Sequence, residues 1–173
     1  MNHIVLYAPE IPQNTGNIMR TCVATHAKLH LIEPLGFSLA DKYVKRSAAN
    51  YLEHLEYHVY PDFDDFFAKN QGNFYFFTRY GLKRPDQIDL SRTDEQHYYF
   101  FGSESSGLPK PLLKANLETC FRLPMSEHVR SMNLANCAAI VLFEALRQQD
   151  YPDLYEHEPE VLKGRDFLKN YSE

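Results

Sequence analysis

The chain has 173 residues, of which 44% are hydrophobic and 14% aromatic, with 12 Tyr, 12 Phe and no Trp. A chain of this size buries roughly two-thirds of its unfolded surface, so we expect one domain that folds without disulfides or metals. The three cysteines, Cys22, Cys120 and Cys137, are odd in number and far apart, which favours buried thiols in a reducing compartment over a disulfide framework.

The net charge of −5 is unusual for a protein that binds nucleic acid, so its distribution matters. From Asp150 to the C-terminus there are seven acidic and three basic residues, which leaves −1 for the first 149 residues. Basic residues gather in three groups, namely Lys42, Lys45 and Arg46; Arg79, Lys83 and Arg84; and Arg122 and Arg130. Each group by itself is more typical of a solvated surface, but together they indicate a local basic face on an acidic protein.

Several partner classes are not expected from the sequence. The first ten residues lack the basic region and apolar run of a signal peptide, and no apolar stretch approaches the roughly 20 residues of a membrane helix. His54 and His58 lie four residues apart without further ligands nearby, so a surface or packing role is expected for them. We therefore expect a cytoplasmic protein with no membrane and no metal partner.

Short β-rich runs alternate with helical stretches along the chain. The expected strands are His3–Tyr7, Leu29–Ile32, Tyr57–Tyr60, Phe74–Thr78, Tyr98–Phe101 and Thr119–Leu123. The expected helices between them are Gly16–His26, Leu39–Ala48, Phe63–Lys69 and Pro111–Ala115. Continuous apolar strands separated by helices are typical of a parallel sheet covered on both faces, so the sequence predicts an α/β fold with a mostly parallel sheet flanked by helices.

A last helix is expected from Leu134 to Gln149, and it is apolar over far more than the usual single stripe. Such a helix must bury a second face, and a partner subunit in a two-fold homodimer is the simplest cover. A central helix inside one subunit is the alternative, which is less usual in so small a domain.

The composition becomes acidic and polar after Tyr151–Pro152, and Gly164 interrupts a candidate helix near the end. We therefore divide the chain into a domain of residues 1–151 and an acidic C-terminal extension of residues 152–173, which is expected to form surface structure.

The first of three segments with chemical potential is Ile11 to Arg20, IPQNTGNIMR, directly after the first strand. Asn14 or Thr15 is expected to cap the helix that follows. Apolar residues occupy one side of this helix and leave Arg20 on the other, one turn above an N-terminus whose free N–H groups favour anions. A capped helix with a solvated arginine is the alternative.

The second segment is Phe101 to Leu108, FGSESSGL, at the end of a strand. Gly102 and Gly107 permit a close backbone approach to a ligand, and Glu104 stands between them at the carboxyl edge of a parallel sheet, where ligands usually bind. The spacing is not GxGxxG and no Walker lysine follows, which argues against a dinucleotide or a nucleoside triphosphate. An ordinary glycine-containing turn is the alternative.

The third segment is Arg122 to Ile140, RLPMSEHVRSMNLANCAAI. A strand ends at Leu123, a polar loop follows, and Ser131 or Asn133 can cap the apolar helix. Capping explains one of those two residues, but it does not explain Arg130, Ser131 and Asn133 together at the mouth of a buried helix.

These motifs, N-T-G-N-x-x-R, F-G-S-E-x-x-G-L and L-P-M…R-S-M-N-L, resemble in order and spacing the SPOUT superfamily of α/β-knot methyltransferases. More narrowly, the chain is similar to the tRNA wobble-nucleotide ribose 2′-O-methyltransferases, from residue 1 to about Tyr151. Three motifs in order are specific, whereas one alone would be weak evidence. Larger relatives carry an RNA-binding domain ahead of the knot; this chain begins at the first strand and resembles the minimal form.

The resemblance implies a C-terminal trefoil knot, which departs from the usual absence of threaded loops, and S-adenosylmethionine as the cofactor. By matching position, the cofactor would contact Phe77, Thr78, Gly102, Leu123, Ser131 and Met132. The polar active-site positions would be Asn14, Arg20, Glu104, Ser131 and Asn133. Contacts to RNA are expected from Arg20, Lys45, Arg46 and Arg130.

Two positions depart from the pattern of the family. Phe143 stands where relatives often have Tyr in the interface helix, so any role of that hydroxyl is missing here. Met132 stands where Leu is frequent, which is a tolerated exchange.

The function implied by the resemblance is methylation of the ribose 2′-OH of the wobble nucleotide (position 34, cytidine or modified uridine) in the anticodon loop of tRNA. The enzyme would be a homodimer that pairs through the knot and the helix of residues 134–149. Ribose methylation of ribosomal RNA and a non-catalytic dimer that binds cofactor and RNA are the alternatives. An unrelated small-molecule enzyme is a weaker one. The complete polar set argues against the non-catalytic dimer, because binding alone does not need all five residues.

Overall fold

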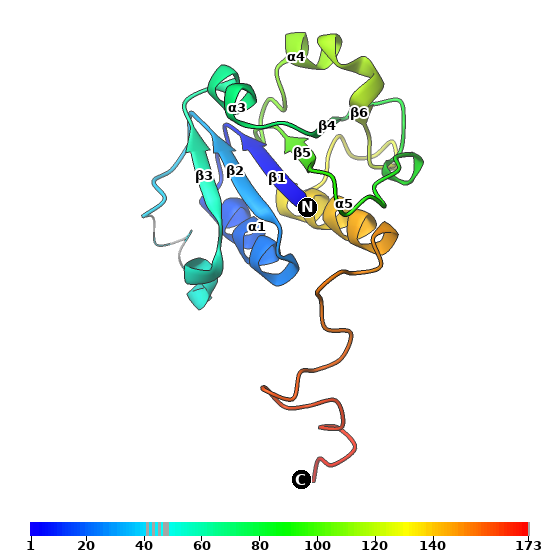
Figure 1. Cartoon of the computed structure of the whole chain (residues 1–173). Helices are drawn as coiled ribbons and strands as arrows, with labels where there is room; N and C mark the ends of the chain where they lie inside the picture. The colour runs from blue at the N-terminus through cyan, green and yellow to red at the C-terminus, as the bar shows by residue number, and fades with distance from the viewer. Residues whose placement is uncertain (41, 43, 45, 47–48, 173) are drawn as a thin grey trace.

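The computed structural model describes residues 1–40, 42, 44, 46 and 49–172 (Figure 1). Six strands form one sheet in the order β3-β2-β1-β5-β4-β6, and every pairing between neighbours is parallel. The strands are β1 (Asn2–Tyr7), β2 (Lys28–Ile32), β3 (Tyr57–Tyr60), β4 (Asn73–Phe77), β5 (His97–Phe101) and β6 (Cys120–Phe121). The expected α/β fold with a parallel sheet is confirmed.

Helices cover both faces of the sheet (Figure 1). On one face α1 (Pro12–Thr25) and α5 (Leu134–Gln148) lie side by side and share a core with alternate strand residues such as Ile4, Leu6 and Tyr99. On the other face α3 (Phe63–Lys69) and α4 (Lys110–Ala115) cover Val5 and Phe100. The described residues also form short 3-10 helices at Ala49–His54, Pro85–Gln87 and Leu117–Thr119.

The prediction of the start of α1 was wrong. The helix begins at Pro12 with Ile11 as its N-cap, so Asn14 and Thr15 lie buried within its first turn and cap nothing. Proline is favoured at this position because it lacks the N–H that the first turn would leave without a partner.

Other boundaries differ less from expectation. The last strand is shorter than the expected Thr119–Leu123. Five of the ten positions of the helix expected at Leu39–Ala48, Lys45 among them, lie outside the described residues.

Residues 152–172 contain turns but neither helix nor strand, so the candidate helix around Gly164 does not form. Gly164 has a φ of +79°, which does not continue a right-handed helix. In Figure 1 this segment runs away from the sheet, and large apolar side chains such as Tyr155 and Leu168 are exposed on it.

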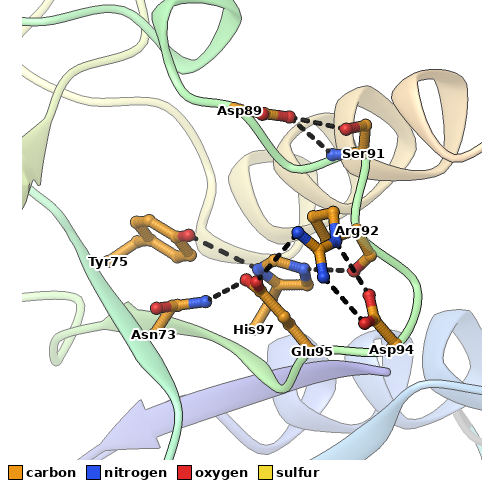
Figure 2. A network of polar contacts seen from close by, with 8 residues as sticks. All are labelled: Asn73, Tyr75, Asp89, Ser91, Arg92, Asp94, Glu95 and His97. Carbon is orange, nitrogen blue, oxygen red and sulfur yellow. Dashed lines mark hydrogen bonds and ion pairs between the residues drawn. The ribbon is translucent and has the colours of Figure 1, made fainter.

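The loop before β5 is fastened to the edge of the sheet opposite the carboxyl ends of the strands (Figure 2). His97 Nε2 donates to the carbonyl of Arg92 at 2.7 Å, and its Nδ1 accepts from the hydroxyl of Tyr75 at 3.4 Å. The guanidinium of Arg92 pairs with Asp94 at 2.8 Å and approaches Glu95 at 3.9 Å. The charge of this arginine is therefore neutralised locally.

Within the described residues, no helix has the length and apolarity needed to span a membrane. The same residues hold no cluster of three or more His, Cys, Asp or Glu side chains suited to a metal ion.

A chain of hydrogen bonds crosses the α3 face of the sheet. His3 Nε2 donates to Gln96 Oε1 at 2.7 Å, so in a neutral ring His3 Nδ1 must accept, and it does so from His30 Nε2 at 2.9 Å. His30 Nδ1 then accepts from the hydroxyl of Tyr60 at 2.9 Å, and that oxygen accepts from Asn70. Each group in this chain donates to the next one toward Gln96. A proton added to the acceptor nitrogen of either histidine would therefore break one of these hydrogen bonds.

Burial lowers the pKa of His3 to about 4 and that of His30 to about 3. In the unfolded chain both would titrate near 6.5, so below that pH the unfolded state binds more protons than the folded state. The stability contributed by the neutral pair is therefore complete above pH 6.5 and is lost as the pH falls toward 4.

We predict that the free energy of unfolding at pH 5 is lower by about 2 kcal/mol for each of the two histidines than at pH 7. His30→Gln keeps one donor and one acceptor but does not titrate, so its loss of stability between pH 7 and pH 5 should be about half that of the parent. Denaturant titration at both pH values measures it, with the exposed His128→Gln as control. An equal pH dependence in His30→Gln and the parent would contradict the assignment.

Candidate functional site

The three segments singled out in the sequence meet at the carboxyl edge of the sheet. They are residues 11–20 at the start of α1, residues 101–108 from the end of β5, and the loop between β6 and α5. Together with the end of β4 they line an open cavity of about 630 Å³. This is the edge at which open parallel sheets bind ligands, and the volume lies in the range of small-molecule sites.

A single carboxylate connects the first two segments. Glu104 accepts hydrogen bonds from the backbone N–H groups of Glu10 at 2.8 Å and Ile11 at 3.1 Å, and from the side-chain amide of Asn14 at 3.1 Å. A second set of bonds joins the same two segments. The carboxylate of Glu10 accepts hydrogen bonds from the backbone N–H of Ser105 at 3.1 Å and from the Ser105 hydroxyl. Charge-assisted bonds of this kind are stronger than neutral ones, so the two loops are held firmly together.

Asn14 also connects the first segment to the third through a hydrogen bond. Its Oδ1 accepts from Asn133 Nδ2 at 2.9 Å, and Asn133 Oδ1 in turn accepts from the backbone N–H groups of Ala135 at 2.9 Å and Asn136 at 3.2 Å. Asn133 is therefore the N-cap of α5, as expected for one of the two candidate residues. One continuous polar network runs from Glu104 through Asn14 to the start of α5.

Gly102 is required by the close packing of its own loop. A Cβ at Gly102 would lie 2.0 Å from the carbonyl carbon of Gly107 and 2.1 Å from the nitrogen of Leu108. Gly107 itself has a φ of +71°, a conformation that favours glycine. The second loop therefore turns back on itself tightly and presents its backbone to the cavity.

The structure brings all the expected cofactor residues to the cavity lining, namely Phe77, Thr78, Gly102, Leu123, Ser131 and Met132. Phe101 and Cys137 add further apolar surface. Burial raises the pKa of the Cys137 thiol, which remains protonated and acts as part of the wall.

Some of the expected polar residues line the cavity and others do not. Four of the five expected active-site residues line the cavity, namely Asn14, Glu104, Ser131 and Asn133. Arg20 does not: it lies on the exposed side of α1, with its guanidinium carbon 5.4 Å from the ring centre of Tyr51. Of the residues expected to bind RNA, Arg130 lines the cavity and Arg46 is exposed on the segment after β2, while Lys45 lies outside the described residues.

Tyr80 and Lys110 also line the cavity, and neither was among the residues expected from the sequence. The available signal for Tyr80 was an aromatic residue within the basic run Arg79–Arg84. Nothing in the sequence marked Lys110 as a site residue, because only the fold brings the start of α4 beside the run Arg79–Arg84.

Comparisons with known proteins agree with this geometry. The SpoU rRNA Methylase family matches residues 1–143. A Bacillus subtilis protein that carries the name of a tRNA (cytidine(34)-2′-O)-methyltransferase is 51% identical over 153 residues, which are 88% of this chain and 96% of that protein.

Two solved structures are also similar. A Bacillus anthracis chain described as an RNA methyltransferase has a TM-score of 0.85 at 48% identity, over 89% of this chain and 98% of that one. A structure described in terms of 2′-OH methylation of C/U34 on tRNA has a TM-score of 0.80 at 38% identity, over 87% of this chain and 97% of that one.

We predict that Glu104→Gln destabilises the protein by about 1.5–3 kcal/mol, because the new amide group would face backbone N–H donors and leave at least one without an acceptor. Denaturant titration measures the loss. The matched control is Glu127→Gln, an exposed position in the third segment, which should change stability by less than about 0.5 kcal/mol. A Glu104→Gln variant as stable as this control would show that the network does not hold the loops.

Proposed function

Because the chain belongs to the SpoU methylase family, we propose that it transfers a methyl group from S-adenosylmethionine to the ribose 2′-oxygen of nucleotide 34 in the anticodon loop of tRNA. The observation that carries this proposal is the meeting of the three segments at one cavity through Glu104, Asn14 and Asn133. Relatives that are 38–51% identical carry the name of a tRNA (cytidine(34)-2′-O)-methyltransferase, which supports tRNA as the substrate.

The lining of the cavity fits S-adenosylmethionine. Phe77, Leu123 and Met132 provide apolar walls for an adenine ring. The tight turn at Gly102 brings backbone groups to the cavity that can form hydrogen bonds with the polar edge of the adenine. When bound, this cofactor supplies a methyl carbon made electrophilic by its sulfonium. Ser131 is placed in the same lining to orient the cofactor or the ribose beside it.

Alignment of the two reactants is the main task of the protein in this reaction. A general base typically contributes about 100- to 10,000-fold, whereas holding reactants in line can lower the barrier by roughly 7–11 kcal/mol. Glu104 is fully engaged with the first loop, so its role is to position that loop. Asn14 and Asn133 position the start of α5 beside Ser131.

Arg20 binds the phosphate next to the target ribose in this proposal. Guanidinium groups stay protonated in proteins, which makes them poor bases and good phosphate ligands. The position of Arg20 outside the cavity lining suits a contact to the RNA backbone, and its guanidinium lies beside the ring of Tyr51.

We predict that Arg20→Ala lowers turnover at saturating RNA by about 10- to 100-fold, the loss expected for a charged hydrogen-bonded contact. Arg20→Lys should also be impaired, because an ammonium cannot make the two parallel bonds of a guanidinium. Methyl transfer from labelled cofactor to a tRNA transcript measures turnover, with the exposed tail variant Arg165→Ala as control. Full turnover by either Arg20 variant would exclude this role.

The activity itself is tested by mass spectrometry of nucleosides from cells with and without the gene. Loss of a 2′-O-methylated nucleotide at position 34, restored by the gene, is the expected result. Loss of a ribose methyl group from ribosomal RNA would favour the ribosomal alternative. Unchanged RNA would favour a dimer that binds cofactor and RNA without catalysis.

The protein acts as a homodimer in this proposal, paired through α5 and the neighbouring knot. Ile140 is 45% exposed and Phe143 49% exposed on the side of α5 that faces away from the sheet. Two exposed apolar side chains on consecutive turns of a helix are a surface that a second copy can cover.

We predict that Phe143→Glu shifts the purified protein from dimer to monomer, because a charge would be buried at the centre of the interface. Sedimentation analysis measures the mass in solution. Leu168→Glu places the same charge on an exposed apolar residue of the tail and should leave the dimer intact. A Phe143→Glu variant that stays dimeric, or a parent that is monomeric, would contradict the proposed interface.

We also propose that the second and third segments and the chain between them form a trefoil knot. The methyltransferase domain in this proposal comprises residues 1–151, with residues 152–173 as an acidic extension. Contacts of the loop after β4 support the knot. Lys83 O accepts from the N–H of Arg122 at 2.9 Å, and Leu90 O accepts from Gln149 at 2.8 Å, so one loop contacts both the end of β6 and the end of α5. A tRNA substrate favours the cytoplasm as the location of the enzyme.

A further inference from the structure

Tyr80 stands at the mouth of the cavity with two cations beside its ring. The side chain is 54% exposed, the guanidinium carbon of Arg79 lies 5.2 Å from the ring centre, and Nζ of Lys110 lies 4.9 Å from it. All three residues belong to the cavity lining. An exposed aromatic ring with cations around it, beside the proposed methyl-transfer site, does not follow from any need of the fold.

The turn that carries Tyr80 is held in place. The carbonyl of Arg79 accepts from the guanidinium of Arg122 at 2.9 Å, and the N–H of Tyr80 donates to the hydroxyl of Thr78 at 3.3 Å. A Cβ at Gly81 would lie 2.3 Å from the carbonyl carbon of Phe121, so the turn packs directly on β6. The backbone is thus fixed while the ring points outward.

Within the part of the chain that the structure describes, the two cations beside Tyr80 differ from their neighbours in having no carboxylate partner. Lys83 pairs with Glu118 at 2.8 Å, Arg84 pairs with Asp86 at 2.9 Å, and Arg92 at the opposite edge pairs with Asp94 (Figure 2). Among the described residues, no carboxylate oxygen lies within 4.0 Å of the charged groups of Arg79 and Lys110.

Besides the ring, Lys110 makes long contacts to the carbonyls of Ser106 at 3.4 Å and Leu108 at 3.5 Å. Arg130, the third cation of the lining, also has no carboxylate within 4.0 Å among the described residues. The carboxylate of Glu104 is occupied by its own hydrogen bonds. The mouth of the cavity is therefore a site of positive charge within an acidic protein.

We propose that Tyr80 stacks on a nucleobase of the RNA substrate next to the methylated nucleotide, while Arg79 and Lys110 bind the adjacent phosphates. The inference rests on the proposed function, because the methylated nucleotide must enter the cavity and its neighbour then lies at the mouth. Unpaired bases of an RNA loop are free to stack on aromatic side chains, and such stacking tolerates any base. Cation–π contacts at exposed sites are weak, so both cations can leave the ring for phosphate.

The test is the affinity of the full-length protein for a fluorescent anticodon stem-loop at saturating S-adenosylmethionine. Tyr80→Leu should weaken RNA binding by about 5- to 100-fold, the loss expected for one base stack, whereas Tyr80→Phe keeps the ring and should stay within about 3-fold of the parent. Affinity for the cofactor alone, measured by calorimetry, should not change. Tyr155→Leu is the control, because Tyr155 is a still more exposed tyrosine in the tail.

The salt dependence of binding tests the two cations separately. Arg79→Gln and Lys110→Gln should each reduce the slope of log K against log salt by about 0.7, the value of one phosphate contact to a single strand. Arg84→Gln should change the slope less, because Asp86 already neutralises Arg84.

The outcomes separate the inference from the proposed function. A parent protein that binds no RNA would overturn both. A parent that binds and methylates RNA while Tyr80→Leu binds equally well would overturn the stacking role alone. A Tyr80→Leu variant that loses affinity for the cofactor and not for RNA would show that the ring is part of the cofactor wall.

Discussion

The carboxylate of Glu104 holds together loops that are about 90 residues apart in the sequence, and the shape of the site depends on it. Its two oxygens accept hydrogen bonds from the N–H groups of Glu10 and Ile11 and from the side-chain amide of Asn14. Asn14 in turn accepts a hydrogen bond from Asn133, the N-cap of α5. A neutral or shorter side chain at position 104 would lose charge-assisted hydrogen bonds from the N–H groups of Glu10 and Ile11, which is costly. The shape of the cavity therefore depends on the hydrogen bonds that the carboxylate of Glu104 accepts.

Cationic side chains have different surroundings at the carboxyl edge of the sheet, where the cavity lies, and at the opposite edge. At the edge opposite the cavity, Arg92 is paired, and on the α3 face His3 and His30 are kept neutral by burial. At the cavity mouth, Arg79 and Lys110 lie beside the ring of Tyr80, and no acidic side chain in the described ranges pairs with either of them. An acidic protein can therefore present positive charge where an RNA backbone would pass, since local pairing and not net charge decides the field at close range.

Much of the fold could be predicted from the sequence, because buried parallel strands are continuous apolar runs and their periodicity is local. The helix Phe63–Lys69 was predicted at its observed bounds. The sequence predicted that Arg20 lies on the side of α1 opposite the apolar residues, where it is found, but not that it lies outside the cavity lining. Six residues at 100° turn Arg20 roughly 120° around the helix from Asn14, which does line the cavity. The pairing of Lys83 with Glu118 also depends on tertiary packing, since the two residues are 35 positions apart.

The most direct test of this account is a double-mutant cycle on Asn14→Ala and Asn133→Ala, with the binding free energy of S-adenosylmethionine measured by calorimetry. If one network shapes the cofactor site, each single variant binds more weakly, and the double variant loses less than the two losses added together by at least about 0.5 kcal/mol. Losses that simply add, or variants that bind the cofactor as tightly as the parent, would contradict it.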